Sequence, residues 1–414
     1  MISMPNAVRS FVSAHTSWIV VAVLVTACMV LGVLTTYVVI HVTRSADTVM
    51  LAAINACGTT ANATACTRRI IQKSLQADTP EHLMRMLAQQ LPPAQCHFVG
   101  HVVGQQTYIR DRDLETALAE CPPTCDSACV HGAIGEVFAE KLGLGTPDDK
   151  TDVDLSHLSP NELRTVGTQL CTSQEACHGV GHATFQSTLD MHKAMDLCSD
   201  VTLPDSSACY NGVAMEYSDI LWSRNMREVD GIVHPDLKGI GTLCLNFSTF
   251  AQMRSCFHYF SRIVVAEMTR QSHTEDEGIA RVRKICEAYR STKLQALCFE
   301  GYGAYRTYLV LTDQDAALNV CGDVQSDRNK AACYYGQVSA GVENRQQLLI
   351  GYCGKLPNEA FQYSCYQTVF SFLYKLEVST ENARAACGDE KSCLQGYADR
   401  AQSPWEMMEK TFAQ

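Results

Sequence analysis

The sequence predicts an all-α protein in which a single N-terminal transmembrane helix precedes a disulfide-rich solenoid of helical-hairpin repeats. Three observations predict this class: a long apolar stretch near the N-terminus, twenty-one cysteines, and a cysteine phrase that recurs along the chain. Strand-like alternation of apolar and polar residues is nearly absent. The expected divisions are a short cytoplasmic tail (1–17), a transmembrane anchor (18–41), extracytoplasmic repeats (45–400) and a C-terminal tail (401–414).

The apolar stretch, WIVVAVLVTACMVLGVLTTYVVI, spans residues 18–40, and no charged residue lies between His15 and His41. A transmembrane helix needs about 20 apolar residues, whereas the apolar core of a cleaved signal peptide has roughly 7–15. The length therefore favours an uncleaved anchor. Two alternatives stay open: cleavage as a signal peptide, and lipoprotein processing before Cys28, although apolar rather than polar residues follow that cysteine.

Charge and cysteine content indicate the partners and the compartment. The net charge is −11 and no basic stripe occurs, which argues against binding of nucleic acid. No CxxC pair is present, so the cysteines are expected to form disulfides, as in oxidising compartments. The chain is therefore expected to contact the membrane through residues 18–41, with its bulk in the periplasm or outside the cell.

The cysteines are arranged as a repeat. Setting aside Cys28 leaves twenty, and most form couples, four of which are spaced by 12 residues: Cys121–Cys129, Cys171–Cys177, Cys198–Cys209, Cys244–Cys256, Cys286–Cys298, Cys321–Cys333, Cys353–Cys365 and Cys387–Cys393. The remaining four pair most simply as Cys57–Cys66 and Cys96–Cys125, although four cysteines allow three arrangements. The second cysteines of the eight couples, together with Cys96, open nine similar phrases, as is typical of repeat proteins.

Each unit is predicted to contain two helices, the first ending near one cysteine and the second beginning near the next. Helix starts are well marked, for example by SPNE at residues 159–162, which fits a capping box with proline in the first turn. Glycine recurs three places after the second cysteine, where it would permit close contact between helices, at Gly132, Gly212, Gly301, Gly336 and Gly396.

These bridged helical hairpins resemble secreted helical-repeat proteins of the Sel1-like and tetratricopeptide class. The resemblance covers most of residues 50–400 and concerns architecture. It implies a stacked α-helical solenoid and no particular activity.

Two units carry histidines four residues apart: His97 and His101 in QCHFVGHVVG, and His178 and His182 in QEACHGVGHATF. Such pairs lie on one face of a helix, a geometry that suits two imidazoles binding one zinc or copper ion. Further ligands could come from His131, Glu136 and Glu216.

A packing interpretation of the same histidines is also open. His97 and His178 occupy a position that is aromatic or apolar in the sibling units, so they could be packed rings. His101 and His182 are harder to explain in this way, because no sibling unit has an ionisable group at their position. Since the pairs belong to the first and third units, a regular solenoid is expected to place a whole helical hairpin between them.

The leading functional prediction is an extracytoplasmic scaffold that binds a protein, peptide or glycan ligand on its concave face. It rests on the repeat architecture, whose concave surface suits binding. The tyrosines gathered in the C-terminal half fit that use, because aromatic residues are enriched at interfaces: Tyr302, Tyr305, Tyr308, Tyr334, Tyr335, Tyr352, Tyr363 and Tyr366. The alternative is a metal-binding or metal-dependent protein that uses the histidine pairs. No GxSxG, HExxH or Walker phrase occurs, and whether the chain is an enzyme stays open.

Overall fold

The structure is a computed structural model that describes residues 47–57, 63–91, 93–122, 124–125, 127–141, 159–200, 206–222, 232, 234–340, 346–374 and 379–412. The chain divides into two compact units, Met1–Gly58 and Thr59–Gln414. In the first unit, residues 47–57 are helical. The predicted cytoplasmic tail and transmembrane anchor lie outside the described residues, and within the described part no helix is both long and apolar enough to cross a membrane.

The described residues form helices and no strands, which confirms the all-α prediction. In the second unit, one series of helices contains the second cysteine of each predicted repeat, close to the start of the helix. This series consists of α4 (Pro93–Asp111), α6 (Ala128–Lys141), α8 (Gln174–Thr188), α10 (Ser206–Trp222), α11 (Phe250–Arg270), α13 (Thr292–Tyr305), α16 (Asp327–Ser339), α18 (Glu359–Tyr374) and α20 (Lys391–Ala398).

A second series of shorter elements comes between them in the chain. It consists of α3 (Pro80–Gln90), α5 (Leu114–Glu120), α7 (Pro160–Leu170), α9 (Met191–Asp200), the 3₁₀ helix η1 (Ile240–Asn246), α12 (Glu275–Ala288), α15 (Gln314–Gly322), α17 (Gln346–Cys353) and α19 (Thr380–Cys387). Three further helices are α2 (Ala63–Ser74), α14 (Thr307–Thr312) and α21 (Pro404–Thr411).

Disulfides tie the two series together. The bridges join the couples that the spacing predicts: Cys96–Cys125, Cys121–Cys129, Cys171–Cys177, Cys198–Cys209, Cys244–Cys256, Cys286–Cys298, Cys321–Cys333, Cys353–Cys365 and Cys387–Cys393. Cys57 and Cys66 are also disulfide-bonded. A bridged helical-repeat architecture is therefore present, and it is compatible with the class that the sequence resembles.

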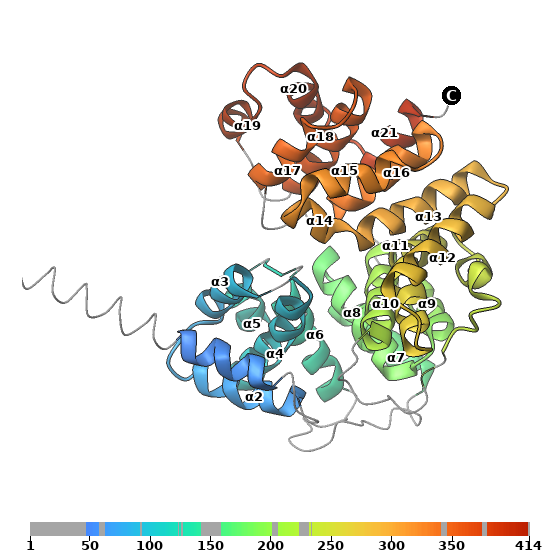
Figure 1. Cartoon of the computed structure of the whole chain (residues 1–414). Helices are drawn as coiled ribbons and strands as arrows, with labels where there is room; N and C mark the ends of the chain where they lie inside the picture. The colour runs from blue at the N-terminus through green and yellow to red at the C-terminus, as the bar shows by residue number, and fades with distance from the viewer. Residues whose placement is uncertain are drawn as a thin grey trace, which may run out of the picture. The chain divides into compact units, whose positions relative to one another are not determined.

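The longer helices pack on one another in chain order. Helix α6 lies between α4 and α8, and α10 lies between α8 and α11; α13, α16, α18 and α20 continue the row (Figure 1). From α5 onward, each shorter element packs on the longer helix that follows it. The prediction that a whole hairpin separates the first and third units is wrong, because a single helix, α6, lies between α4 and α8.

Glycine permits the close approach of these neighbours. A Cβ atom on Gly132 of α6 would lie 1.9 Å from the carbonyl oxygen of His101 on α4, a distance that no real side chain tolerates. In the same way, a Cβ atom on Gly212 of α10 would lie 2.0 Å from the carbonyl oxygen of His178 on α8. The predicted role of this glycine position in helix contact is confirmed.

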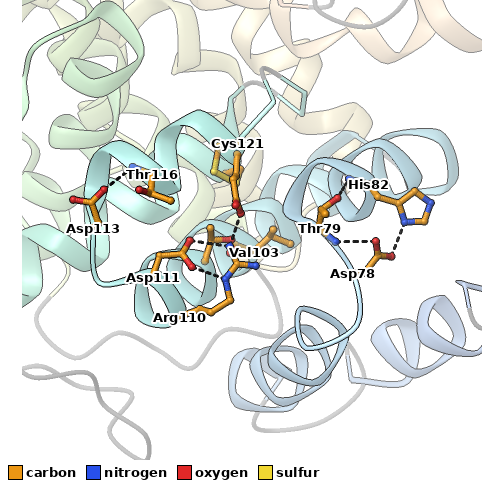
Figure 2. Close-up of polar contacts among 12 residues, drawn as sticks. Asp78, Thr79, His82, Val103, Arg110, Asp111, Asp113, Thr116 and Cys121 are labelled. Carbon is orange, nitrogen blue, oxygen red and sulfur yellow. Dashed lines mark hydrogen bonds and ion pairs between the residues drawn. A yellow bond between two sulfur atoms is a disulfide. The ribbon is translucent and has the colours of Figure 1, made fainter.

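Many of the described helices begin where a side chain caps the first turn. Ser159 and Glu162 form the predicted capping box at the start of α7. In Figure 2, Asp113 accepts a hydrogen bond from the backbone N–H of Thr116 at the start of α5, as Thr79 does from His82 at the start of α3. Caps of this kind typically contribute about 1 kcal/mol each. Helices α5 and α7 are capped in this way at the start and bridged at the end, through Cys121 and Cys171.

Candidate metal centre

Five histidines meet in one cluster. They come from three helices that are neighbours in the row of longer helices. Helix α4 supplies His97 and His101, α6 supplies His131, and α8 supplies His178 and His182. The ring centroids of His97 and His101 are 4.5 Å apart, as are those of His131 and His178, while those of His101 and His182 are 5.0 Å apart. The structure therefore brings together all five predicted histidines, which we call the histidine cluster.

The helix row explains this convergence. Histidines four residues apart project from the same face of α4 and of α8, so each helix presents a pair. Gly132 brings the backbone of α6 against that of α4, and Gly179 brings α8 against α6, since its Cβ atom would lie 3.2 Å from the Cα atom of His131. His131 is consequently inserted between the two pairs.

Four of the rings have nitrogen atoms that lie almost close enough together to coordinate a single metal ion. One nitrogen from each of His97, His101, His131 and His182 lies within 4.8 Å of the other three. Zinc–nitrogen bonds of about 2.0–2.1 Å in a tetrahedron place the nitrogens about 3.4 Å apart. The four nitrogens thus need to close by at most about 1.5 Å, a movement that side-chain rotation supplies.

Each ring of the cluster has one buried nitrogen with no hydrogen-bond partner among the described residues: Nε2 of His97, His101, His178 and His182, and Nδ1 of His131. His97, His131 and His182 are themselves no more than 4% exposed. A buried polar atom without a partner destabilises the fold by about 1–3 kcal/mol. Five such atoms in one place would therefore be strongly destabilising if the histidines served only in packing. A bound metal ion would satisfy their lone pairs.

Hydrogen bonds fix the orientation of two of these rings. Nδ1 of His97 donates to the carbonyl oxygen of Cys125 at 2.8 Å. Cys125 has a left-handed backbone, with φ of 54°, and is bridged to Cys96, the residue before His97. Because a carbonyl oxygen only accepts, Nδ1 carries the proton, and Nε2 is left with a lone pair that faces the cluster.

His182 is held by a carboxylate. Its Nδ1 lies 2.5 Å from Oε2 of Glu216 on α10, and the other oxygen of Glu216 accepts a hydrogen bond from Nε2 of Gln186 at 2.8 Å. Histidines that bind metals commonly donate their other N–H to a carboxylate or a carbonyl in this way. Glu216 therefore contacts the outer nitrogen of His182 and acts as its hydrogen-bond partner, rather than as the metal ligand that the sequence suggested.

Burial keeps His101, His131, His178 and His182 neutral at physiological pH. Burial, reinforced by neighbouring histidines, holds the pKa values of His101, His131 and His178 well below the usual value, and it lowers the pKa of His182 to about 3. Burial raises the pKa of Glu216, and the hydrogen bond from Gln186 opposes that rise. Neutral imidazoles are the form that binds a metal ion, so no proton has to be displaced from these rings first.

Two features of the site were missed from the sequence. One is the role of Glu216, which lies 34 residues from His182 along the chain. The other is a glutamine that follows the second histidine of each pair by four residues, Gln105 on α4 and Gln186 on α8. Both helices therefore carry the pattern HxxxHxxxQ. That recurrence was the available signal for Gln186. The remaining predicted candidate ligand, Glu136, is buried on α6.

The tyrosines of the C-terminal half serve mainly in packing. Five of the eight are buried: Tyr302, Tyr334, Tyr335, Tyr352 and Tyr366. Tyr308 is the most exposed of the set, at 44%. Most of the tyrosines that suggested a ligand-binding surface are therefore in the core. Binding of a protein, peptide or glycan ligand stays a prediction from the sequence.

Comparison of the chain with protein-family models, with curated proteins and with solved structures finds no match. The functional argument accordingly rests on the residues and geometry of the site.

Proposed function

We propose that this protein binds a transition-metal ion, zinc or copper, in the histidine cluster. The observation that carries the proposal is the convergence of five rings, each with a buried nitrogen that has no hydrogen-bond partner among the described residues. Four of these rings each have a nitrogen within 4.8 Å of those of the other three. Imidazole nitrogen is a preferred ligand of both metals. The ion would join three successive repeat units, because its ligands come from α4, α6 and α8.

The sibling units support this proposal over packing. At the position of His101 and His182 they carry residues that need no polar partner, such as Ile134, Ala214 and Val338. All three are fully buried in the structure. Apolar side chains therefore suffice to pack that position of the row, and histidine there adds unpartnered nitrogen atoms that packing does not require.

The test is titration of the purified, chelator-treated full-length chain with cobalt(II), followed by displacement with zinc. Cobalt(II) in a site of nitrogen ligands absorbs visible light, so its binding can be followed directly. We expect one equivalent to bind, with a visible spectrum that zinc abolishes. Absence of a saturable spectrum, together with zinc affinity no tighter than micromolar, would exclude the metal site.

We also propose that residues 18–41 anchor the chain in a membrane, with the repeats in an oxidising compartment. The uncharged apolar stretch and the many disulfides support this topology. Protease added outside host cells should digest the chain beyond residue 45, while the anchor stays in the membrane fraction. A soluble protein whose N-terminus lies beyond residue 30 would indicate a cleaved signal peptide instead.

A further inference from the structure

The fourth repeat unit places a charge beside the histidine cluster although it supplies no imidazole to it. Glu216 of α10 is 8% exposed, and its carboxylate lies on the outer nitrogen of His182. His97, by contrast, donates its Nδ1 proton to a neutral backbone carbonyl. Two rings of one cluster therefore have outer partners of different charge.

Close helix contact holds this carboxylate in place. Gly181 and Gly212 let α8 and α10 touch along their backbones: a Cβ atom on Gly181 would lie 2.1 Å from the carbonyl oxygen of Cys209. Gln186, one turn beyond His182 on α8, donates to the second oxygen of Glu216 at 2.8 Å. Both carboxylate oxygens thus accept a hydrogen bond from one face of α8, which fixes the carboxylate relative to the ring.

We infer that Glu216 is a positioning and specificity-determining residue that favours a divalent ion over cuprous ion in the proposed metal site. The inference rests on the proposed function. Glu216 orients His182 by its hydrogen bond and attracts the bound ion by its charge across the ring. Since Coulomb energy is proportional to the charge of the ion, this attraction is twice as large for zinc(II) or copper(II) as for copper(I).

The test compares Glu216→Gln with the wild-type full-length chain. Glutamine keeps the size of the side chain and an acceptor oxygen for His182 but removes the charge. Partners of this kind typically contribute 10–100-fold to metal affinity, so we expect zinc binding to weaken by about that factor. Half the electrostatic energy corresponds to the square root of the factor, so cuprous binding should weaken by only about 3–10-fold.

Affinities are measured by competition, with a zinc indicator for zinc and with bicinchoninate for ascorbate-reduced copper. The control is Glu267→Gln: Glu267 is 1% exposed and also accepts from a histidine, since Nδ1 of His234 lies 3.1 Å from its carboxylate, yet it is not in contact with the cluster histidines through any described hydrogen bond. This control should leave both affinities unchanged. A second variant, Glu216→Asp, keeps the charge but withdraws the carboxylate from His182 by one methylene. It should therefore also weaken zinc binding more than cuprous binding, by smaller factors than Glu216→Gln does.

The outcomes separate the two proposals. Wild-type protein that binds neither ion would overturn the proposed function and this inference with it. Wild-type protein that binds zinc, combined with equal losses for both ions in Glu216→Gln, would overturn only the inference. If Glu216→Gln does not fold, Glu216→Asp decides: a larger loss of zinc than of cuprous ion supports the role of the charge, and equal losses contradict it.

Discussion

Replacing His97 or His182 by asparagine should weaken metal binding by about 100-fold or more, while leaving the metal-free fold nearly unchanged. Both histidines use Nδ1 for a hydrogen bond and leave Nε2 facing the cluster. The amide nitrogen of asparagine lies close to where histidine has Nδ1. It can therefore keep the bond to the Cys125 carbonyl or to Glu216, while the ligand atom is deleted.

The choice of asparagine follows from the structure. Alanine occupies the position of His101 and His182 in two sibling units, as Ala214 and Ala398, but it is a poor test in this structure. His182 is only 2% exposed and bonded to Glu216, so alanine would leave a cavity and remove a hydrogen-bond donor from a buried carboxylate. Asparagine opens a smaller cavity and deletes one unpartnered nitrogen, two effects of about 1–3 kcal/mol and of opposite sign.

The metal-dependent stabilisation can be worked out from mass action. At a metal concentration 100 times the wild-type Kd, binding stabilises the fold by about 2.7 kcal/mol, or roughly 3–4 °C in Tm for a chain of this size. Loss of a ligand should weaken binding at least as much as loss of its outer partner, about 100-fold. At the same concentration the gain then falls to about 0.4 kcal/mol, or less than about 1 °C.

The assay is thermal unfolding with and without zinc. The control is His82→Asn, because His82 lies on α3, its side chain is 45% exposed, and its Nδ1 contacts Asp78 (Figure 2). His82→Asn should keep the full zinc-dependent rise in Tm. A full rise in His97→Asn and His182→Asn as well would show that these histidines are not ligands.

Three further predictions concern the close helix contact at Gly132, the Cys96–Cys125 disulfide and the pH dependence of stability. Gly132→Ala should abolish metal binding and destabilise the fold by about 1–3 kcal/mol or more in chemical denaturation, because its Cβ would lie 1.9 Å from the His101 carbonyl and would push α4 away from His131. Removing the Cys96–Cys125 bridge, which spans 29 residues, should cost about 3–4 kcal/mol of stability and also weaken metal binding about 10–100-fold, because the carbonyl that orients His97 is released. Metal-free protein should lose stability as pH falls below about 6.5: the folded-state pKa values of the buried histidines lie below the unfolded value, so the unfolded chain takes up protons first, at about 1.4 kcal/mol per pH unit for each ring. Denaturation at pH 7.5 and pH 5.5 measures this loss. Bound zinc should leave the loss nearly unchanged, because these rings are already neutral in the metal-free fold.

Matched controls exist for each of these predictions. Gly135→Ala lies on the same helix as Gly132, and its Cβ would have no neighbour within 4 Å, so metal binding should persist. Removing the Cys387–Cys393 bridge should lower stability without changing metal affinity. Weakened metal binding in either control would point to a general loss of folding instead of a local effect. Stability that does not change between pH 7.5 and pH 5.5 would contradict the conclusion that burial keeps His101, His131, His178 and His182 neutral.

Much of the fold was predictable because the cysteine couples and the recurring glycine can be recognised from short stretches of the sequence. Couples such as Cys286–Cys298 can bridge only if one helix ends and another begins between them. Gly132 and its equivalents mark close contact because any side chain would clash there. The order in which helices stack is not local, and for that reason the sequence led to the wrong expectation of a hairpin between the two histidine pairs.

The candidate site was predictable in its residues and not in its geometry. The spacing of His97 and His101 shows that they share a helix face, and the same holds for His178 and His182. Nothing in the spacing shows that His131 enters between the pairs, since that depends on the contact of Gly132 with α4. The contact of Glu216 with His182 depends in the same way on how α10 meets α8.

The most direct test of the metal centre is the metal content of the purified full-length chain, determined by elemental mass spectrometry after dialysis against metal-free buffer. We predict about one zinc or copper ion per chain, retained through dialysis, removed by a strong chelator and restored by adding back the ion. A protein with all its disulfides formed that retains no metal, and that binds added zinc or copper no more tightly than micromolar, would contradict the assignment of the histidine cluster as a metal site.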